Sequence, residues 1–149
     1  MTVYMVAGSQ CEKVKKNENR LYVMKWSNMI KTDKQDQEDS DMDSDEADEL
    51  FKEPTMRVET VPHRGAVNRI RSMHGSPIVA TWNEDAEVGI YNVAQAMEEL
   101  EKPTGNKKPC GGCKLAGFKH KFEGWALDWS PLTYGRLASG SNDAQLWLY

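Results

Sequence analysis

Two stretches decide the fold of this 149-residue chain: "EDAEVGIY" at residues 84–91 and "NDAQLWLY" at residues 142–149. When they are aligned on Asp85 and Asp143, alanine follows in both, apolar residues stand three and five positions later, and tyrosine stands six positions later. Residues two positions apart point to the same face of a β-strand. Each stretch therefore predicts a tight turn followed by a strand, and the pair indicates an internal repeat.

A histidine precedes each aspartate at nearly the same distance. His63 lies 22 residues before Asp85, and His120 lies 23 residues before Asp143, which gives the repeat a period of about 57 residues. A turn aspartate can accept hydrogen bonds from backbone amides and from a buried imidazole, so that neither group is left unpaired. We therefore expect six residues to have a structural role in the repeat: His63, Asp85, Tyr91, His120, Asp143 and Tyr149.

Short strand-like runs occupy most of the remaining chain. Many short strands separated by turn residues indicate an all-β sandwich, barrel or propeller, and an internal repeat favours the propeller. Only residues 92–102 have a helical pattern, because Val93, Ala96, Met97 and Leu100 fall on one stripe before Pro103. The predicted strands are "TVYMVAG", "RLYVMKW", "MRVETV", "AVNRIR", "SPIVATW", "EVGIY", "WALDW", "GRLASGS" and "QLWLY".

An acidic run separates the second and third of these strands. Residues 33–49 contain ten acidic residues and one lysine, a local charge of -9, whereas the whole chain has a charge of -4. One interpretation is a solvated, disordered loop that contributes only solubility. The other is a flexible polyanion that attracts basic clients over long range. The predicted client-binding residues are Asp39, Asp41, Asp43, Asp45, Glu46, Asp48 and Glu49, and Ser40 is a predicted phosphorylation site.

Other patterns in the chain argue against catalysis and metal binding. Cys110 and Cys113 form one CxxC, but the chain has no second CxxC to complete a zinc site and no βαβ unit for a redox site. We expect a glycine-rich surface loop there, with no metal and no cofactor. Arg69 and Arg71 share a strand face, but no aromatic platform accompanies them, so direct nucleic-acid binding is not expected. No apolar stretch approaches the roughly 18 residues of a membrane helix.

The repeat resembles the WD repeat of β-propellers, with tyrosine in place of the usual tryptophan. This resemblance implies about two and a half blades of a probable seven-bladed propeller, so the chain is expected to be truncated at both ends. A propeller requires at least four blades. The expected organisation is a partial first blade at residues 1–32, an acidic loop at 33–53, a second blade with an outer strand at 54–119, which includes a helical insert at 93–115, and a partial third blade at 120–149.

The wording of several stretches resembles one branch of these proteins. "YMVAGSQ", "VPHRGAVNRIR" and above all "EGWALDWSP" at residues 123–131 are similar to the glutamate-rich WD-repeat proteins, relatives of the histone-chaperone propellers. This resemblance implies a non-enzymatic chaperone of ribosome assembly in the nucleus and nucleolus. Its expected partners are a basic large-subunit ribosomal protein, pre-ribosomal particles and histones. The alternative is a generic WD-repeat adaptor, such as a ubiquitin-ligase substrate receptor.

Overall fold

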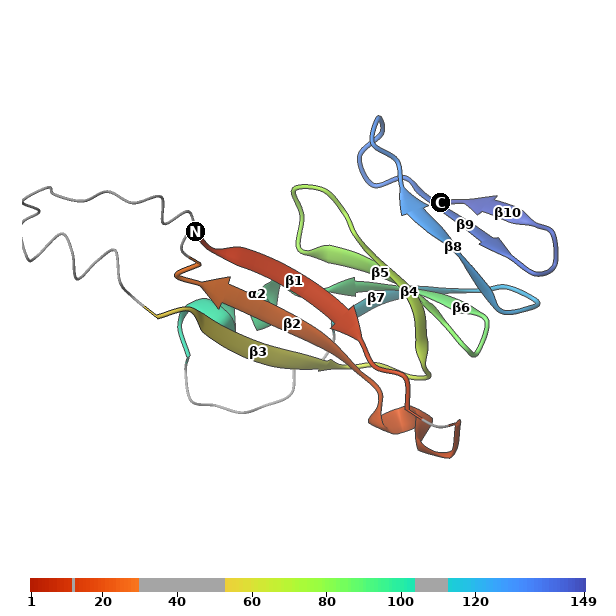
Figure 1. Ribbon diagram of the computed structural model, residues 1–149. Coiled ribbons are helices and arrows are strands. Elements are labelled where there is room, and N and C mark those ends of the chain that lie inside the picture. Colours follow the sequence, from red (N-terminus) through yellow and green to blue (C-terminus); the bar gives the residue numbers. More distant parts are fainter. Residues whose placement is uncertain (12, 30–52, 104–112) are drawn as a thin grey trace, which may run out of the picture.

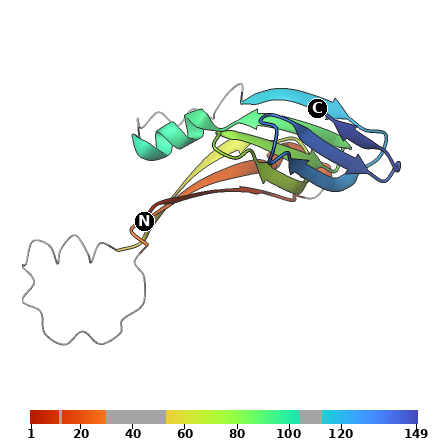
Figure 2. The same ribbon diagram turned by 90° about the horizontal axis from the view of Figure 1, so that it is seen from above.

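The computed structural model describes residues 1–11, 13–29, 53–103 and 113–149. They form three antiparallel sheets, one short α-helix and one 3-10 helix, and the sheets lie face to face as a stack (Figures 1 and 2). The elements in chain order are β1 Val3–Gly8, η1 Lys13–Glu18, β2 Arg20–Ser27, β3 Thr55–Pro62, β4 Val67–Ser72, β5 Ile78–Asn83, β6 Glu87–Asn92, α2 Ala94–Glu101, β7 Lys114–Lys119, β8 Gly124–Trp129, β9 Leu137–Ser141 and β10 Leu146–Leu148.

The first sheet has the order β1-β2-β3, the second β4-β5-β6-β7 and the third β10-β9-β8. Every pair of neighbouring strands is antiparallel and follows directly along the chain, as in the blades of a WD-repeat propeller. The fold is therefore all-β and is a WD-repeat propeller fragment, as the repeat predicted. β3 pairs with β2 along its whole length, so this outer strand hydrogen-bonds within the first sheet. β7, which was not among the predicted strands, pairs with β6.

The two aspartates that define the repeat lie in equivalent turns. In the second sheet, the backbone N–H of Ala86 donates to the carbonyl of Asn83, and in the third sheet that of Ala144 donates to Ser141. The alanine after each aspartate has a left-handed backbone, with φ values of 61° and 59°. A left-handed alanine is uncommon, so its presence at the same place in both copies shows that the sequence repeat is also a structural repeat.

Two hydrophobic seams hold the stack together. Between the first and second sheets, Leu21, Val23 and Val61 pack against Val79 and Tyr91. Between the second and third sheets, the packed residues are Ala80, Trp82, Val88, Leu127 and Leu137. Trp82 is fully buried, and its indole N–H donates to the carbonyl of Ala126 across the seam at 2.9 Å.

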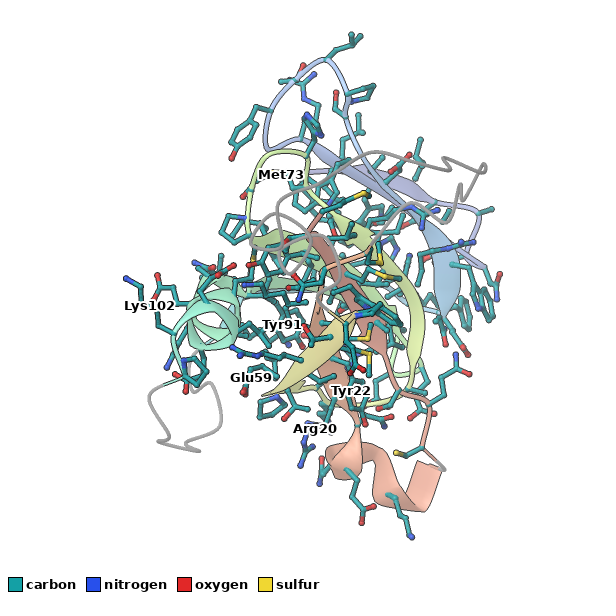
Figure 3. All side chains as sticks on the ribbon, turned by 60° about the vertical axis from the view of Figure 1, so that its left-hand side comes forward. Arg20, Tyr22, Glu59, Met73, Tyr91 and Lys102 are labelled. Atoms are coloured by element: carbon teal, nitrogen blue, oxygen red, sulfur yellow. The ribbon has the colours of Figure 1, made fainter. Side chains whose placement is uncertain are left out.

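Helix α2 fastens the second sheet to the first. It follows β6, yet it packs against β2 and β3. The buried residues Val93, Ala96 and Leu100 confirm the predicted stripe, and the Lys25 ammonium pairs with Glu101 near the end of the helix. Figure 3 shows Lys102 on the outer side of the molecule, where α2 ends. Helix α2, the described first part of the insert, thus belongs to the interface between two sheets.

Candidate functional site

The third sheet brings its histidine, its tyrosine and a serine into hydrogen-bonding contact. His120 Nε2 lies 2.8 Å from Ser139 Oγ, and Ser139 Oγ lies 3.1 Å from the Tyr149 hydroxyl. On the other side of the ring, His120 Nδ1 faces Asp143 Oδ2 at 3.9 Å. With the proton on Nδ1, Nε2 accepts from the Ser139 hydroxyl, which in turn accepts from Tyr149. Ser139 thus connects the imidazole to the tyrosine by hydrogen bonds, whereas Nδ1 and Asp143 Oδ2 are buried and too far apart for one.

Aromatic rings enclose this imidazole from both sides. The His120 ring centroid lies 4.8 Å from that of Trp82 in the second sheet and 4.4 Å from that of Trp147. Burial lowers the pKa of His120, and the Asp143 carboxylate acts against that shift. Hydrogen bonds, first from Ser141, lower the pKa of Asp143. The imidazole is therefore neutral at pH 7 and is enclosed by rings rather than open to a substrate.

The second sheet repeats the contact between imidazole and hydroxyl. His63 Nε2 lies 3.1 Å from Thr81 Oγ1, and the ring lies 5.3 Å from that of Tyr91. Its Nδ1 donates to the carbonyl of Gly65 at 2.9 Å, because a carbonyl oxygen can only accept. Burial lowers the pKa of His63 and raises the pKa of Tyr91 to about 12, with the Glu87 carboxylate adding to the second shift.

The aspartates of the two turns have different surroundings. The Asp85 carboxylate pairs with the exposed Arg64 guanidinium at 3.4 Å. The turn amides of Asp85 and Glu87 donate to Asn83 Oδ1, both at 3.0 Å. In the third sheet, Asp143 itself accepts from the amide of Gln145. Asn83 has therefore taken over the turn hydrogen bonds in the second sheet, while the carbonyl of Gly65 occupies the Nδ1 side of His63.

Sequence reasoning missed two members of these constellations. Thr81 and Ser139 each stand four residues before the turn aspartate. The hydroxyl group of each lies within hydrogen-bonding distance of the imidazole in its own repeat. Aligning the hydroxyl residues of the two copies would have found them. The position of Trp82 against His120 was not visible in the sequence, because it joins one repeat to the next.

The acidic residues and Ser40 lie outside the described residues, but both ends of the segment that contains them are described. Asn28 Nδ2 donates to the carbonyl of Glu53 at 3.2 Å, and the amide of Met29 donates to the carbonyl of Met1. These contacts follow directly on the last pair of the β2–β3 ladder, Ser27 with Thr55. The described residues on either side of the acidic segment are therefore held next to each other at one end of the first sheet.

The basic residues of β4 lie against β8 of the next sheet. Arg69 Nε donates to the carbonyl of Trp125, and Arg71 pairs with Asp128 at 3.7 Å. Trp129 Nε1 donates to the carbonyl of Arg71. These contacts use part of the hydrogen-bonding capacity of both guanidinium groups. They connect β4 of the second sheet to β8 of the third.

The cysteine expected on a surface loop is buried. Cys113 belongs to the first seam and is disulfide-bonded, Cys11 is free, and Cys110 lies outside the described residues. The surface prediction was wrong for Cys113, because the residue comes directly before β7 and belongs to the buried cluster that contains Tyr91 and Val93. Among the described residues, no group of three metal-ligating side chains occurs. No helix in this part of the chain is long and apolar enough to cross a membrane.

Comparison with known proteins identifies the family of the chain. The chain is 41% identical over 150 residues to glutamate-rich WD repeat-containing protein 1 of Dictyostelium discoideum, covering 93% of this chain and 30% of that protein. The chain belongs with the glutamate-rich WD-repeat proteins. It is also 31% identical over 154 residues to ribosome assembly protein rrb1 of Schizosaccharomyces pombe, covering 98% of this chain and 30% of that relative.

A shorter match links this glutamate-rich WD-repeat chain to a second group. It is 37% identical over 87 residues to histone acetyltransferase type B subunit 2 of Aspergillus fumigatus, covering 58% of this chain and 18% of that protein. No protein-family model matches the chain. The chain thus spans less than a third of the length of each of these three relatives.

Proposed function

We propose that this chain acts in ribosome biogenesis as part of a non-enzymatic WD-repeat scaffold that holds basic clients, in the nucleus and within the nucleolus. The observation that carries the proposal is the match of nearly the whole chain to a relative named as a ribosome assembly protein. The clients are a basic large-subunit ribosomal protein, within pre-ribosomal particles, and histones. The match to a histone acetyltransferase subunit supports the histone part.

The distribution of charge supports capture of basic clients. The segment 33–49 contains ten acidic residues and one lysine and has a charge of -9, while the chain as a whole has only -4. A dense run of carboxylates raises the local concentration of a lysine- and arginine-rich partner and accelerates its association, and salt weakens both effects. Binding of this kind would keep such a partner from associating with nucleic acid until it is handed over.

The described contacts support a structural role for the sheets and leave client binding to the acidic segment. Four titratable residues inside the sheets contact neighbouring hydroxyl groups and aromatic rings: His63, His120, Tyr91 and Tyr149. They have shifted pKa values because they are buried, not because they line an open site. The client-binding chemistry then belongs to the segment between β2 and β3. Asn28, which precedes this segment, donates a hydrogen bond to Glu53, which follows it.

The test is to neutralise the ten acidic residues of 33–49 to asparagine and glutamine, and to measure binding of a fluorescent lysine-rich peptide by anisotropy from 50 to 300 mM salt. We expect the affinity to fall most at low salt and the salt dependence to flatten, because the electrostatic attraction is removed. The same variant should recover fewer ribosomal proteins from a nucleolar extract.

The matched control is a chain in which residues 33–49 are shuffled without changing their composition. It keeps the local charge of -9 and should bind the peptide as the parent chain does, because attraction by a flexible polyanion depends on charge density. Unchanged affinity of the neutralised variant at low salt would remove the segment from the mechanism. A partner set without ribosomal proteins would favour a generic WD-repeat adaptor.

A further inference from the structure

The loop that connects β8 to β9, residues 130–136, exposes two large side chains. Leu132 and Tyr134 have 94% and 74% of their surface exposed. Among the described residues, no other large apolar side chain is more exposed than Leu132. One exposed leucine on a surface is ordinary, but two large side chains within three residues form a compact apolar tip.

Hydrogen bonds within the loop hold its backbone in one shape. The amide of Ser130 donates to the carbonyl of Arg136 at 2.8 Å and closes the base of the loop. The Ser130 hydroxyl oxygen accepts from the amides of Leu132 at 3.2 Å and Thr133 at 3.0 Å. The amide of Arg136 donates to the carbonyl of Thr133. A loop that is fixed before binding loses less conformational entropy when a partner covers it.

The equivalent loop of the second sheet, residues 73–77, is built differently. Its large apolar side chain, Met73, is buried with 9% of its surface exposed. The amide of Met73 donates to the carbonyl of Ile78, and the amide of Ser76 donates to the carbonyl of Met73. The connection between these two strands can therefore bury its apolar residue, and the exposed tip belongs to the third sheet alone among the two.

The tip is separate from the face of the third sheet on which a neighbouring blade of a complete propeller packs. The β8–β9 ladder ends with the pair Trp129 and Leu137, and Leu132 and Tyr134 lie beyond it. Packing of a blade against the strands therefore leaves the tip uncovered. The strand residues of that face are Ala126, Asp128, Ala138, Gly140, Leu146 and Leu148.

The loop lies at the end of the stack from which the acidic segment leaves the first sheet. Strands β2, β4 and β8 end on this side, and β3, β5 and β9 begin there, whereas η1 and the turns after β5 and β9 lie at the opposite end (Figure 1). Asn28 and Glu53, which flank the acidic segment, are joined at this end. A basic client attracted by residues 33–49 therefore arrives on the side where the tip projects.

The loop itself adds no attraction for a basic client. Its charged residue is Arg136, which is exposed at the base, whereas the tip is uncharged. Contact with the tip is therefore apolar, and the positive charges of the client must lie elsewhere on it. Tyrosine is among the residues that contribute most to binding at protein interfaces, because its rigid ring buries a large area at a small cost in entropy.

We infer, on the basis of the proposed function, that this loop is a second contact for the same client. Residues 33–49 hold the lysine- and arginine-rich part of the client, while Leu132 and Tyr134 insert into an apolar recess of its folded part. The partner is thus a basic protein with a folded part and not a free basic tail. The acidic segment gives rapid attraction, and the loop gives a contact that depends on shape.

The test compares two probes on the double variant L132S/Y134S. One probe is a lysine-rich peptide, which has charge but no folded part. The other is the mixture of proteins extracted from purified large ribosomal subunits, in which each bound protein is identified and quantified by mass spectrometry. The variant should retain at least about tenfold less of the ribosomal proteins that the parent binds. Its affinity for the peptide, and the salt dependence of that affinity, should stay unchanged.

The matched control is Phe122→Ser. Phe122 has 49% of its surface exposed and lies between β7 and β8, at the opposite end of the stack. This variant should bind both probes as the parent does. The changed side chains are all exposed, so both variants should keep the parent circular dichroism spectrum. An equal loss of ribosomal proteins with Phe122→Ser overturns the inference, because the loss would not be specific to the loop.

The outcomes distinguish this inference from the proposed function. A parent that binds no large-subunit ribosomal protein overturns the proposed function and the inference together. A parent whose binding requires the acidic segment, but is equally strong without Leu132 and Tyr134, overturns the inference alone. Loss of the peptide with L132S/Y134S also overturns it, because the loop would then act on the charged part of the client.

Discussion

Trp82 is the side chain on which the second seam depends most, and replacing it by alanine tests the stacking of the sheets. The indole is fully buried between two sheets, touches the His120 ring and donates to the carbonyl of Ala126. Truncation of a buried tryptophan costs about 3–5 kcal/mol, and the carbonyl that loses its donor adds about 1–3 kcal/mol. A domain of ordinary stability has about 5–15 kcal/mol in all.

The loss should be concentrated in the third sheet, because Trp82 is the large side chain that the second sheet inserts there. Urea unfolding followed by circular dichroism gives the size of the change, and hydrogen exchange gives its location. We expect the amides of β8 and β9 to lose protection before those of β2 and β5.

The control is Trp125→Ala, which removes the same kind of side chain from β8 of the neighbouring third sheet. Trp125 has 45% of its surface exposed, so the expected cost is about 1 kcal/mol. If Trp82→Ala destabilised the chain no more than Trp125→Ala does, the second seam would not depend on Trp82. Uniform loss of protection in all three sheets would likewise contradict a local effect.

Three further changes test other parts of the stack. Burial lowers the pKa of both histidines below the ordinary 6.5, so the folded chain binds protons less readily than the unfolded chain and loses stability as the pH falls through that value. The double variant H63Q/H120Q should therefore show a smaller fall in melting temperature between pH 7 and pH 5 than the parent chain. An unchanged slope would contradict this. Leu100→Ala should cost about 2–5 kcal/mol in urea unfolding and detach α2, whereas Lys25→Ala should cost under about 1 kcal/mol. Gly124→Ala should abolish amide protection at the second seam in hydrogen exchange, because its methyl group would meet the Gly140 carbonyl and the Trp82 ring.

Local patterns were sufficient to predict most strands, the helix and the repeated turn. Alternation of apolar residues in "EVGIY" and the stripe through Val93 and Leu100 correspond to β6 and α2. β7 was missed because "KLAGFK" has lysines at both ends and no β-branched residue, so its strand character comes from pairing with β6. The different partners of the two histidines were also out of reach, since only the three-dimensional structure places the Gly65 carbonyl at Nδ1 of His63 and the Asp143 carboxylate near Nδ1 of His120.

The first sheet shows why its two faces were harder to assign than its strands. "RLYVMKW" is apolar at most positions instead of alternating, which is the pattern of a strand covered on both sides. Its one central charge, Lys25, points inward, because α2 brings Glu101 to it there. Trp26 and Met24 are left on the opposite face, where Trp26 keeps 36% of its surface exposed. The direction of Lys25 thus depends on α2, which follows it in the chain by about 70 residues, and a local pattern in β2 does not contain that information.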